Sequence, residues 1–307
     1  MVGGCASPPL NHRWIVRCPQ PLMVCLNTVN GVLFCMEEKR KFRDTAMEQR
    51  LQKTLDDGHR VWVIGDVHGF HLTLEGLLEQ LSLSAEDMVV FLGDLIDRGP
   101  GSYQVVQTVM NHPQFVSVLG NHEEMMMQQF TMERLARHDQ EVVAWWHNGG
   151  SSTVFSYEQA HTDDANQLDE PEMYAAVEQH RDWLSTLPLH IVLDRWRLVH
   201  AGYDPTLPLD EQSEGEYLWI RRAFHETTVP VDPQRTVVFG HTPTPALPGH
   251  STANLGEIWQ SSVVLEDGRS ASIGIDTCLF HRQPGAKHLT AYDLQTGTVV
   301  HQARIEP

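Results

Sequence analysis

The sequence predicts an α/β fold in which polar turns meet at one edge of a sheet. From about Gly58 onward, short apolar strands alternate with amphipathic helices in the order β-α-β-α-β-α. A polar motif follows each of the first three strands: GDVHG (65–69), GDLIDRG (93–99) and GNHEE (120–124). Because open α/β sheets bind ligands at the carboxyl ends of their strands, we expect the functional site at that edge.

The elements of the first half are predicted from their apolar spacing. Leucines recur at helical intervals between His71 and Leu81, which predicts a helix there. A second helix is expected at Ser102–Asn111, and a third runs through Met125, Met126, Phe130 and Leu135. The apolar runs RVWVI, DMVVFL and FVSVL, which end at the three polar motifs, predict buried strands.

Two strands of the second half are expected to end in histidine. The runs RWRLVHAG (195–202) and RTVVFGHT (235–242) place His200 and His241 at their ends. Segments 261–276, 288–294 and 296–305 predict a closing run of antiparallel strands with Asp-Gly and Thr-Gly turns. Residues 148–170 are polar and rich in Ser, Thr, Asp and Gln, so we interpret them as a loop over the site.

The charge of the chain narrows the classes of partner. Asp plus Glu number 40 and Lys plus Arg number 22, which gives a formal net charge of −18. Such a chain repels nucleic acid and anionic membranes at long range, so we expect neither as a partner and disfavour a nuclease.

The first 46 residues differ in composition from the rest and carry none of the motifs. Four of the five cysteines lie there, so that only Cys278 remains in the motif-bearing part, which fits a reducing, cytoplasmic setting. The apolar run Pro21–Met36 is short for a membrane span and lies late for a signal peptide. We expect residues 1–46 to be an extension, disordered or absent from the native protein, and 58–307 to form the catalytic domain. A chain that starts at Met47 is expected to fold.

The motifs carry residue types that suit a pair of divalent metal ions. Asp94 lies 28 residues after Asp66 and 28 residues before His122, one strand-helix-strand repeat in each direction. Asp oxygens and His nitrogens suit Mn, Fe or Zn, and two such ions about 3.5–4 Å apart can clamp a phosphoryl group during in-line displacement. One strand-end His is ordinarily structural, but five such turns in this order predict a metal centre.

As a set, these motifs resemble those of the PPP-type, calcineurin-like metallophosphoesterases, in particular the compact bacterial and phage serine/threonine protein phosphatases. The resemblance extends from about Arg60 to the C-terminus and includes WWHNGG (145–150), LWIR (218–221) and GIDT (274–277). It implies a sandwich of two central mixed β-sheets flanked by helices. The chain departs from many relatives at Cys278, where they have Gly after the Asp-Thr pair.

The resemblance also implies roles for ten residues. Asp66, His68 and His241 would hold one metal ion, Asn121 and His200 would complete the second site, and Asp94 would bridge both. His122 would be the general acid, paired with Asp97, while Arg98 and Arg221 would hold the phosphate oxygens. A serine alkoxide is a poor leaving group, so it needs an acid such as a carboxylate-paired His.

Two of the arginine assignments have alternatives. Arg98 could instead form a salt bridge with Asp97 or a neighbouring acid. Arg222 follows Arg221 directly, although the LWxR pattern favours Arg221.

The function expected from the resemblance is hydrolysis of phosphoserine and phosphothreonine in proteins. A hydroxide bridging two divalent ions, manganese first with iron or zinc as alternatives, would be the nucleophile. The rivals are a symmetrical diadenosine tetraphosphate hydrolase and a catalytically inactive metal-binding regulator, although no expected ligand is missing. No regulatory subunit is evident. Four aromatics near the motifs could stack a base but are better explained by packing: Trp145, Trp146, Tyr203 and Trp219.

Overall fold

The computed structural model describes residues 42–131, 140–281 and 285–307. The chain divides into two units, Met1–Lys39 and Arg40–Pro307, and all the elements described below belong to the second. Most of the expected 1–46 extension therefore lies outside the described residues. Across the described ranges, none of the helices has the length and apolar character needed to cross a bilayer.

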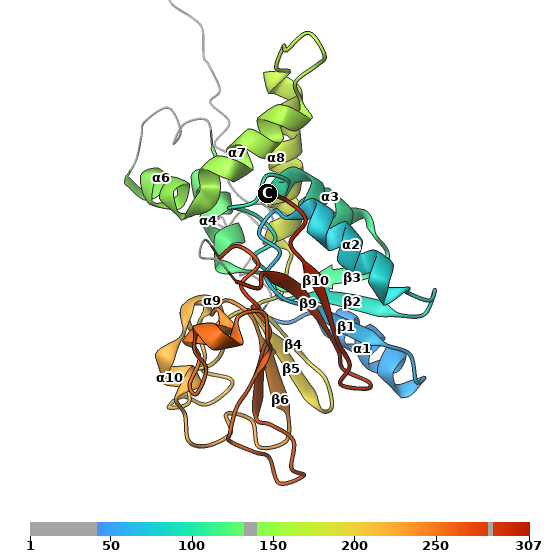
Figure 1. Cartoon of the computed structure of the whole chain (residues 1–307), viewed down its shortest axis with the longest axis vertical. Coiled ribbons are helices and arrows are strands. Elements are labelled where there is room, and N and C mark those ends of the chain that lie inside the picture. Colours follow the sequence, from blue (N-terminus) through green and yellow to red (C-terminus); the bar gives the residue numbers. More distant parts are fainter. Residues whose placement is uncertain (1–41, 132–139, 282–284) are drawn as a thin grey trace, which may run out of the picture. The chain divides into compact units, whose positions relative to one another are not determined.

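The first sheet contains five strands in the order β10-β9-β1-β2-β3. Strands β1, β2 and β3 run parallel, whereas β9 pairs antiparallel with both β1 and β10. Helices α2 and α3 connect the parallel strands and cover one face of this sheet (Figure 1). The bounds are β1 Val61–Ile64, α2 His71–Leu81, β2 Met88–Phe91, α3 Ser102–Asn111, β3 Phe115–Ser117, β9 His288–Asp293 and β10 Val299–Ala303.

The second sheet also contains five strands, in the order β4-β5-β6-β8-β7. Strands β5, β6 and β8 are parallel, and β4 and β7 flank them in antiparallel orientation. The bounds are β4 His190–Val192, β5 Trp196–Val199, β6 Thr236–Phe239, β7 Trp259–Gln260 and β8 Ser272–Gly274. Two mixed sheets with flanking helices confirm the predicted fold class. Of the antiparallel pairing expected within 261–276, a single bridge between Val264 and Ser270 is present, and β8 joins β6 in parallel.

Alternating residues of the central strands face two different cores. In β1, Trp62 and Ile64 pack into a cluster with the leucines of α2, whereas Val61 and Val63 pack into a second cluster. This second cluster also contains Leu198 of β5 and residues of β6 and β8, so it joins the two sheets face to face. The period of two along a strand therefore explains how one short strand serves both layers.

Residues 148–170 do not form the predicted loop. They contain the end of the helix η1 (Trp146–Gly150) and the helix α7 (Ser151–Ala160), and they reach the start of α8 (Glu170–Ser185). Thr153, Ser156 and Tyr157 of α7 are buried, and the two hydroxyl groups of Thr153 and Ser156 bond to Asp97 and to the backbone N–H of Tyr103. The polar composition was therefore a wrong guide, because these side chains make internal hydrogen bonds. Two shorter helices precede them, α4 (Asn121–Gln129) and α6 (Gln140–Trp145), and Leu135 lies outside the described residues.

The helix α1 (Thr45–Asp56) extends the catalytic unit toward the N-terminus. The Asp44 side chain caps the helix by accepting hydrogen bonds from the backbone N–H groups of Ala46 and Met47. Glu48 is buried, pairs with Arg43 at 2.7 Å and accepts a hydrogen bond from the backbone of β4. The expected boundaries at residues 46 and 58 thus fall within one compact unit that begins at Arg40.

Candidate active site

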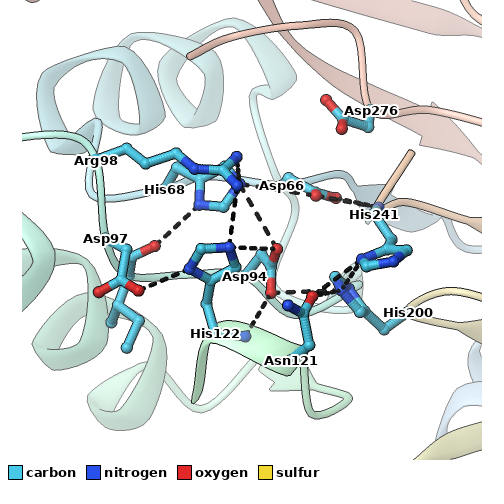
Figure 2. Close-up of polar contacts among 12 residues, drawn as sticks. Asp66, His68, Asp94, Asp97, Arg98, Asn121, His122, His200, His241 and Asp276 are labelled. Atoms are coloured by element: carbon cyan, nitrogen blue, oxygen red, sulfur yellow. Dashed lines mark hydrogen bonds and ion pairs between the residues drawn. The ribbon is translucent and has the colours of Figure 1, made fainter. Parts of the chain in front are cut away.

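The predicted ligands lie where the parallel strands of the two sheets end. Asp66 and His68 follow β1, Asp94 follows β2, and Asn121 begins α4 after β3, while His200 and His241 follow β5 and β6 of the other sheet. Figure 2 shows their side chains converging on one small volume. All six are buried: Asp66, His68, Asp94, Asn121, His200 and His241.

Close backbone contact holds the Asp94 turn against the start of α4. A Cβ atom on Gly120 would lie 2.2 Å from the Asp94 amide nitrogen, so only glycine fits between the two turns. The carboxylate of Glu123 accepts hydrogen bonds from the backbone N–H groups of Asp94, Leu95 and Gly120 at 2.7–3.0 Å. Sequence reasoning assigned no role to Glu123, although the motif GNHEE contains it.

Asp66, His68 and Asp94 form one side of the centre. The Nε2 atom of His68 lies 3.6 Å from Asp94 Oδ2 and 3.9 Å from Asp66 Oδ2. On the opposite side of the ring, Nδ1 lies 3.0 Å from the Ile96 carbonyl oxygen, which can only accept. This contact places the proton on Nδ1 and leaves the Nε2 lone pair facing the two carboxylates, as a metal ligand requires.

Asn121, His200 and His241 form the other side of the centre. Asn121 Oδ1 lies 2.8 Å from His200 Nε2 and 2.9 Å from His241 Nδ1, and His200 Nε2 is 3.3 Å from Asp94 Oδ1. The His241 ring thus lies with Asn121 and His200 rather than with Asp66 and His68, the residues it was expected to join. The backbone N–H of His241 binds Asp66, but φ is 63° at this residue and its ring turns toward Asn121 instead.

The donor set fits two divalent cations. Because His200 Nδ1 bonds to the Leu92 carbonyl oxygen, its Nε2 is an acceptor that faces the acceptor oxygens of Asn121 and Asp94. Converging acceptors without protons between them are a site for positive charge. The described residues contain two groups able to hold an ion, one of His68, Asp94 and His122 and one of Asp94, His200 and His241. Asp94 belongs to both.

The buried carboxylates respond to each other and to the histidines. Burial disfavours the ionised form of Asp94, but His200 and the other three neighbouring histidines outweigh it and hold the pKa of Asp94 below its usual range. For Asp66, burial and then the charge of Asp276 raise the pKa well above its ordinary value. The ionised form is thus favoured at Asp94 and disfavoured at Asp66, where a nearby cation would stabilise it.

His122 lies against this centre but is held from behind by Asp97. Its Nδ1 is 2.6 Å from Asp97 Oδ2, and its Nε2 faces the centre, 3.8 Å from Asp94 Oδ2. Burial opposes the charged ring, but Asp94 and the hydrogen bond to Asp97 outweigh it, so the pKa of His122 is raised. Asp97 also accepts hydrogen bonds from Trp145 Nε1 at 2.9 Å and Thr153 Oγ1 at 2.5 Å.

The two predicted phosphate-binding arginines reach the centre from different loops. The guanidinium of Arg98 contacts His68 Nε2 at 2.6 Å and His122 Nε2 at 3.0 Å, and it stacks 3.7 Å above the ring of Phe280. Within the described part of the chain it forms no ion pair with Asp97, the alternative weighed from the sequence. Arg221 donates hydrogen bonds to the His241 carbonyl oxygen and Thr242.

Arg222, the alternative to Arg221, does not face the centre. Its side chain is exposed to solvent and pairs with Glu226. The structure therefore brings all ten predicted site residues together and leaves Arg222 out.

Several site residues adopt left-handed backbone conformations that favour glycine. Positive φ values occur at His68 (48°), Asp94 (50°), Asp97 (70°), Arg98 (72°), His241 (63°) and Cys278 (69°). Five of these six are predicted site residues, and strained backbone at a cluster of polar residues is typical of functional sites.

A cavity of about 860 Å³ opens beside Arg98. Phe280, Trp146 and Arg304 line it, together with Asn148, Ser151 and Ser152. Trp146 is 42% exposed. Trp145 and Tyr203 are fully buried, which confirms the prediction that these two aromatic side chains pack in the interior. Trp219 is 45% exposed and donates its Nε1–H to Glu124.

The chain belongs to the calcineurin-like phosphoesterase family, whose model matches residues 59–253. This match confirms the family predicted from the motifs. A solved structure described as a candidate diadenosine tetraphosphatase shares the fold, with a TM-score of 0.50 and 23% identity, over 80% of this chain and 93% of that one.

Curated relatives carry two different names. Serine/threonine-protein phosphatase 2 of Escherichia coli is 45% identical over 71 residues, which are 23% of this chain and 32% of the relative. The symmetrical bis(5'-nucleosyl)-tetraphosphatase of Coxiella burnetii is 35% identical over 79 residues, which are 25% of this chain and 27% of the relative. The matched residues thus cover about a third or less of the length of each relative. Both names describe the relatives and not this chain.

Proposed function

We propose that this phosphoesterase hydrolyses phosphomonoesters, with phosphoserine and phosphothreonine in proteins as its substrates. The observation that carries the proposal is the position of Asp94 between two clusters of hydrogen-bond acceptors. His122, which Asp97 holds in place, lies next to Asp94. Such an arrangement combines a place for two cations with a proton donor, which are the two requirements for cleaving an ester with a poor leaving group.

Asp66, His68 and Asp94 would hold one ion, and Asp94, Asn121, His200 and His241 the other. When bound, two divalent ions supply positive charge for the phosphoryl oxygens and a water molecule activated near neutral pH. We propose manganese as the ions, since carboxylate, amide and imidazole ligands suit it. The backbone contacts of Glu123 keep the Asp94 turn in place for this task.

His122 would donate a proton to the leaving oxygen through Nε2. Asp97 fixes the proton on Nδ1 and stabilises the charged ring before transfer. Arg98 and Arg221 would bind the phosphate oxygens, and Arg98 would then exchange its contacts with His68 and His122 for the substrate. The planar guanidinium matches phosphate geometry in two parallel hydrogen bonds.

The cavity beside Arg98 supports a polypeptide substrate. It opens to solvent next to the phosphate-binding arginine, and serine, asparagine and aromatic side chains line it. A phosphorylated loop needs room on either side of the phosphate, together with polar side chains that can form hydrogen bonds with its backbone. Among the residues that the structure describes, no aspartate or glutamate lines this cavity, so an anionic substrate meets little repulsion from its walls despite the acidic chain.

A second candidate substrate is diadenosine tetraphosphate. The exposed ring of Trp146 and the ring of Phe280 face the same cavity and could stack an adenine. The test is to measure kcat/KM of the manganese-loaded protein for phosphoserine peptides and for diadenosine tetraphosphate. A preference of at least about tenfold for the peptides is expected, and the opposite preference would replace the first proposal by the second.

A further inference from the structure

One parallel strand end has no predicted role at the centre. Strands β1, β2 and β3 of one sheet and β5 and β6 of the other each end in a residue discussed above. The remaining parallel strand is β8, which pairs with β6 and continues its ladder through the Ile275 N–H bond to Phe239. The next residue is Asp276. By the same topology that brings in His241, Asp276 lies at the shared edge of the sheet.

The Asp276 carboxylate is buried yet incompletely bonded. The residue is 2% exposed, and its Oδ1 accepts one hydrogen bond, from the Cys278 N–H at 3.2 Å. Within the described residues, Oδ2 has no hydrogen-bond partner. Leaving a buried carboxylate oxygen unpaired costs free energy, so such an atom calls for a partner that the apoprotein lacks.

The Asp276 carboxylate lies on the side of the centre that contains Asp66. Figure 2 shows the Asp276 carboxylate pointing inward above Asp66 and His241. The carboxylate therefore faces the residues that would hold the cation on the Asp66 side.

The two sides of the centre are unequally equipped. Apart from the shared Asp94, one side has Asn121, His200 and His241, whereas the other has only Asp66 and His68. An additional carboxylate beside Asp66 would therefore add a candidate ligand to the side that has fewer of them.

We propose that Asp276 is a further residue of the metal centre, whose carboxylate strengthens the binding of the cation on the Asp66–His68 side. This inference rests on the proposed two-metal function but not on the identity of the substrate. It also gives a role to the GIDT motif, whose aspartate no argument from the sequence had used.

The test is a calorimetric titration of metal-free protein with Mn²⁺, comparing the wild type with Asp276→Asn. Asparagine keeps the acceptor for the Cys278 N–H and removes only the charge. One of two binding steps should weaken by about 10–100-fold, the usual effect of losing a supporting residue, and the other should change little. The matched control is Asp293→Asn, because Asp293 is equally buried but caps a turn between β9 and β10.

Thermal unfolding of the same metal-free proteins separates this role from a structural one. Removal of an unpaired buried charge beside Asp66 should raise the melting temperature by about 2–4 °C, or leave it unchanged. Unaltered affinity at both steps would overturn the proposal, as would a variant that melts lower without metal or fails to fold. A preference for diadenosine tetraphosphate over phosphopeptides would overturn only the proposed substrate and leave this result standing.

Discussion

The hydrogen bond between Asp97 and His122 gives the sharpest test of the proposed acid. In Asp97→Asn, the side chain keeps its shape but loses its charge and one acceptor. In the wild type, His122 and Trp145 both donate to Oδ2 and Thr153 donates to Oδ1, and an amide oxygen cannot replace both acceptors. The ring of His122 therefore loses its charged partner while the packing around it remains.

The expected loss follows from the 2.6 Å contact between the two side chains. A hydrogen bond between charged groups contributes about 1.5–3 kcal/mol, which corresponds to about 10–150-fold in rate. The loss should appear in kcat on phosphoserine peptides, whose leaving alkoxide requires a proton. On p-nitrophenyl phosphate, whose leaving group departs without one, the change should stay within about threefold.

The assay measures kcat on both substrates at the same pH and the same saturating Mn²⁺ concentration. The control is Asp232→Asn, since Asp232 is a buried carboxylate that pairs with Arg197 and Arg235, neither of which is a predicted site residue. Equal losses on the two substrates would refute the acid role of His122, because they would indicate general damage to the site.

Three more predictions concern metal binding, the N-terminal boundary and pH. Asp94→Asn should lose both bound ions as measured by metal analysis, and a variant that retains two ions per chain would remove Asp94 from the bridging position. In urea, the free energy of unfolding of a chain that starts at Met47 should be about 2–4 kcal/mol lower than that of one that starts at Arg40. The shorter chain loses the Asp44 helix cap and the backbone hydrogen bonds to the Phe42 carbonyl oxygen. Equal stability of the two chains would contradict this account. Burial, with Arg197 second, lowers the pKa of His190 to about 3. The folded state therefore keeps this ring neutral, and its stability should fall by about 1.4 kcal/mol per pH unit as pH decreases below about 6.5, a slope that His190→Gln should reduce.

The convergence of Asp66, Asp94 and Asn121 could be predicted from the sequence, because each follows a strand whose direction is fixed by the strand-helix-strand repeat. Asp66, Asp94 and Asn121 are separated by similar chain lengths, so their convergence requires no knowledge of distant packing. The grouping of these side chains around Asp94 was less predictable. It depends on the direction of the His241 ring, which is set by a positive φ and by contact with the other sheet.

Residues that act through hydrogen bonds were also hard to identify. The contact of Thr153 with Asp97 joins α7 to the turn after β2, and the intervening 56 residues offer no periodic signal for it. The polar segment 148–170, which contains Thr153, was predicted to be a loop, because composition does not distinguish solvated side chains from internally bonded ones. The role of Phe42 was missed for a related reason, since its carbonyl oxygen accepts hydrogen bonds from the backbone N–H groups of Leu189 and His190, which lie far along the chain.

The left-handed turns at the centre have a consequence for attempts to make this protein more robust. Each non-glycine residue held in that conformation costs about 1–3 kcal/mol, and the six together are comparable to the whole stability of an ordinary domain. A selection for heat resistance alone would therefore favour glycine at positions such as Asp94 and His241, where the backbone would relax. Those variants would persist longer and hydrolyse nothing, so thermostable and active forms must be sought in the two apolar clusters instead.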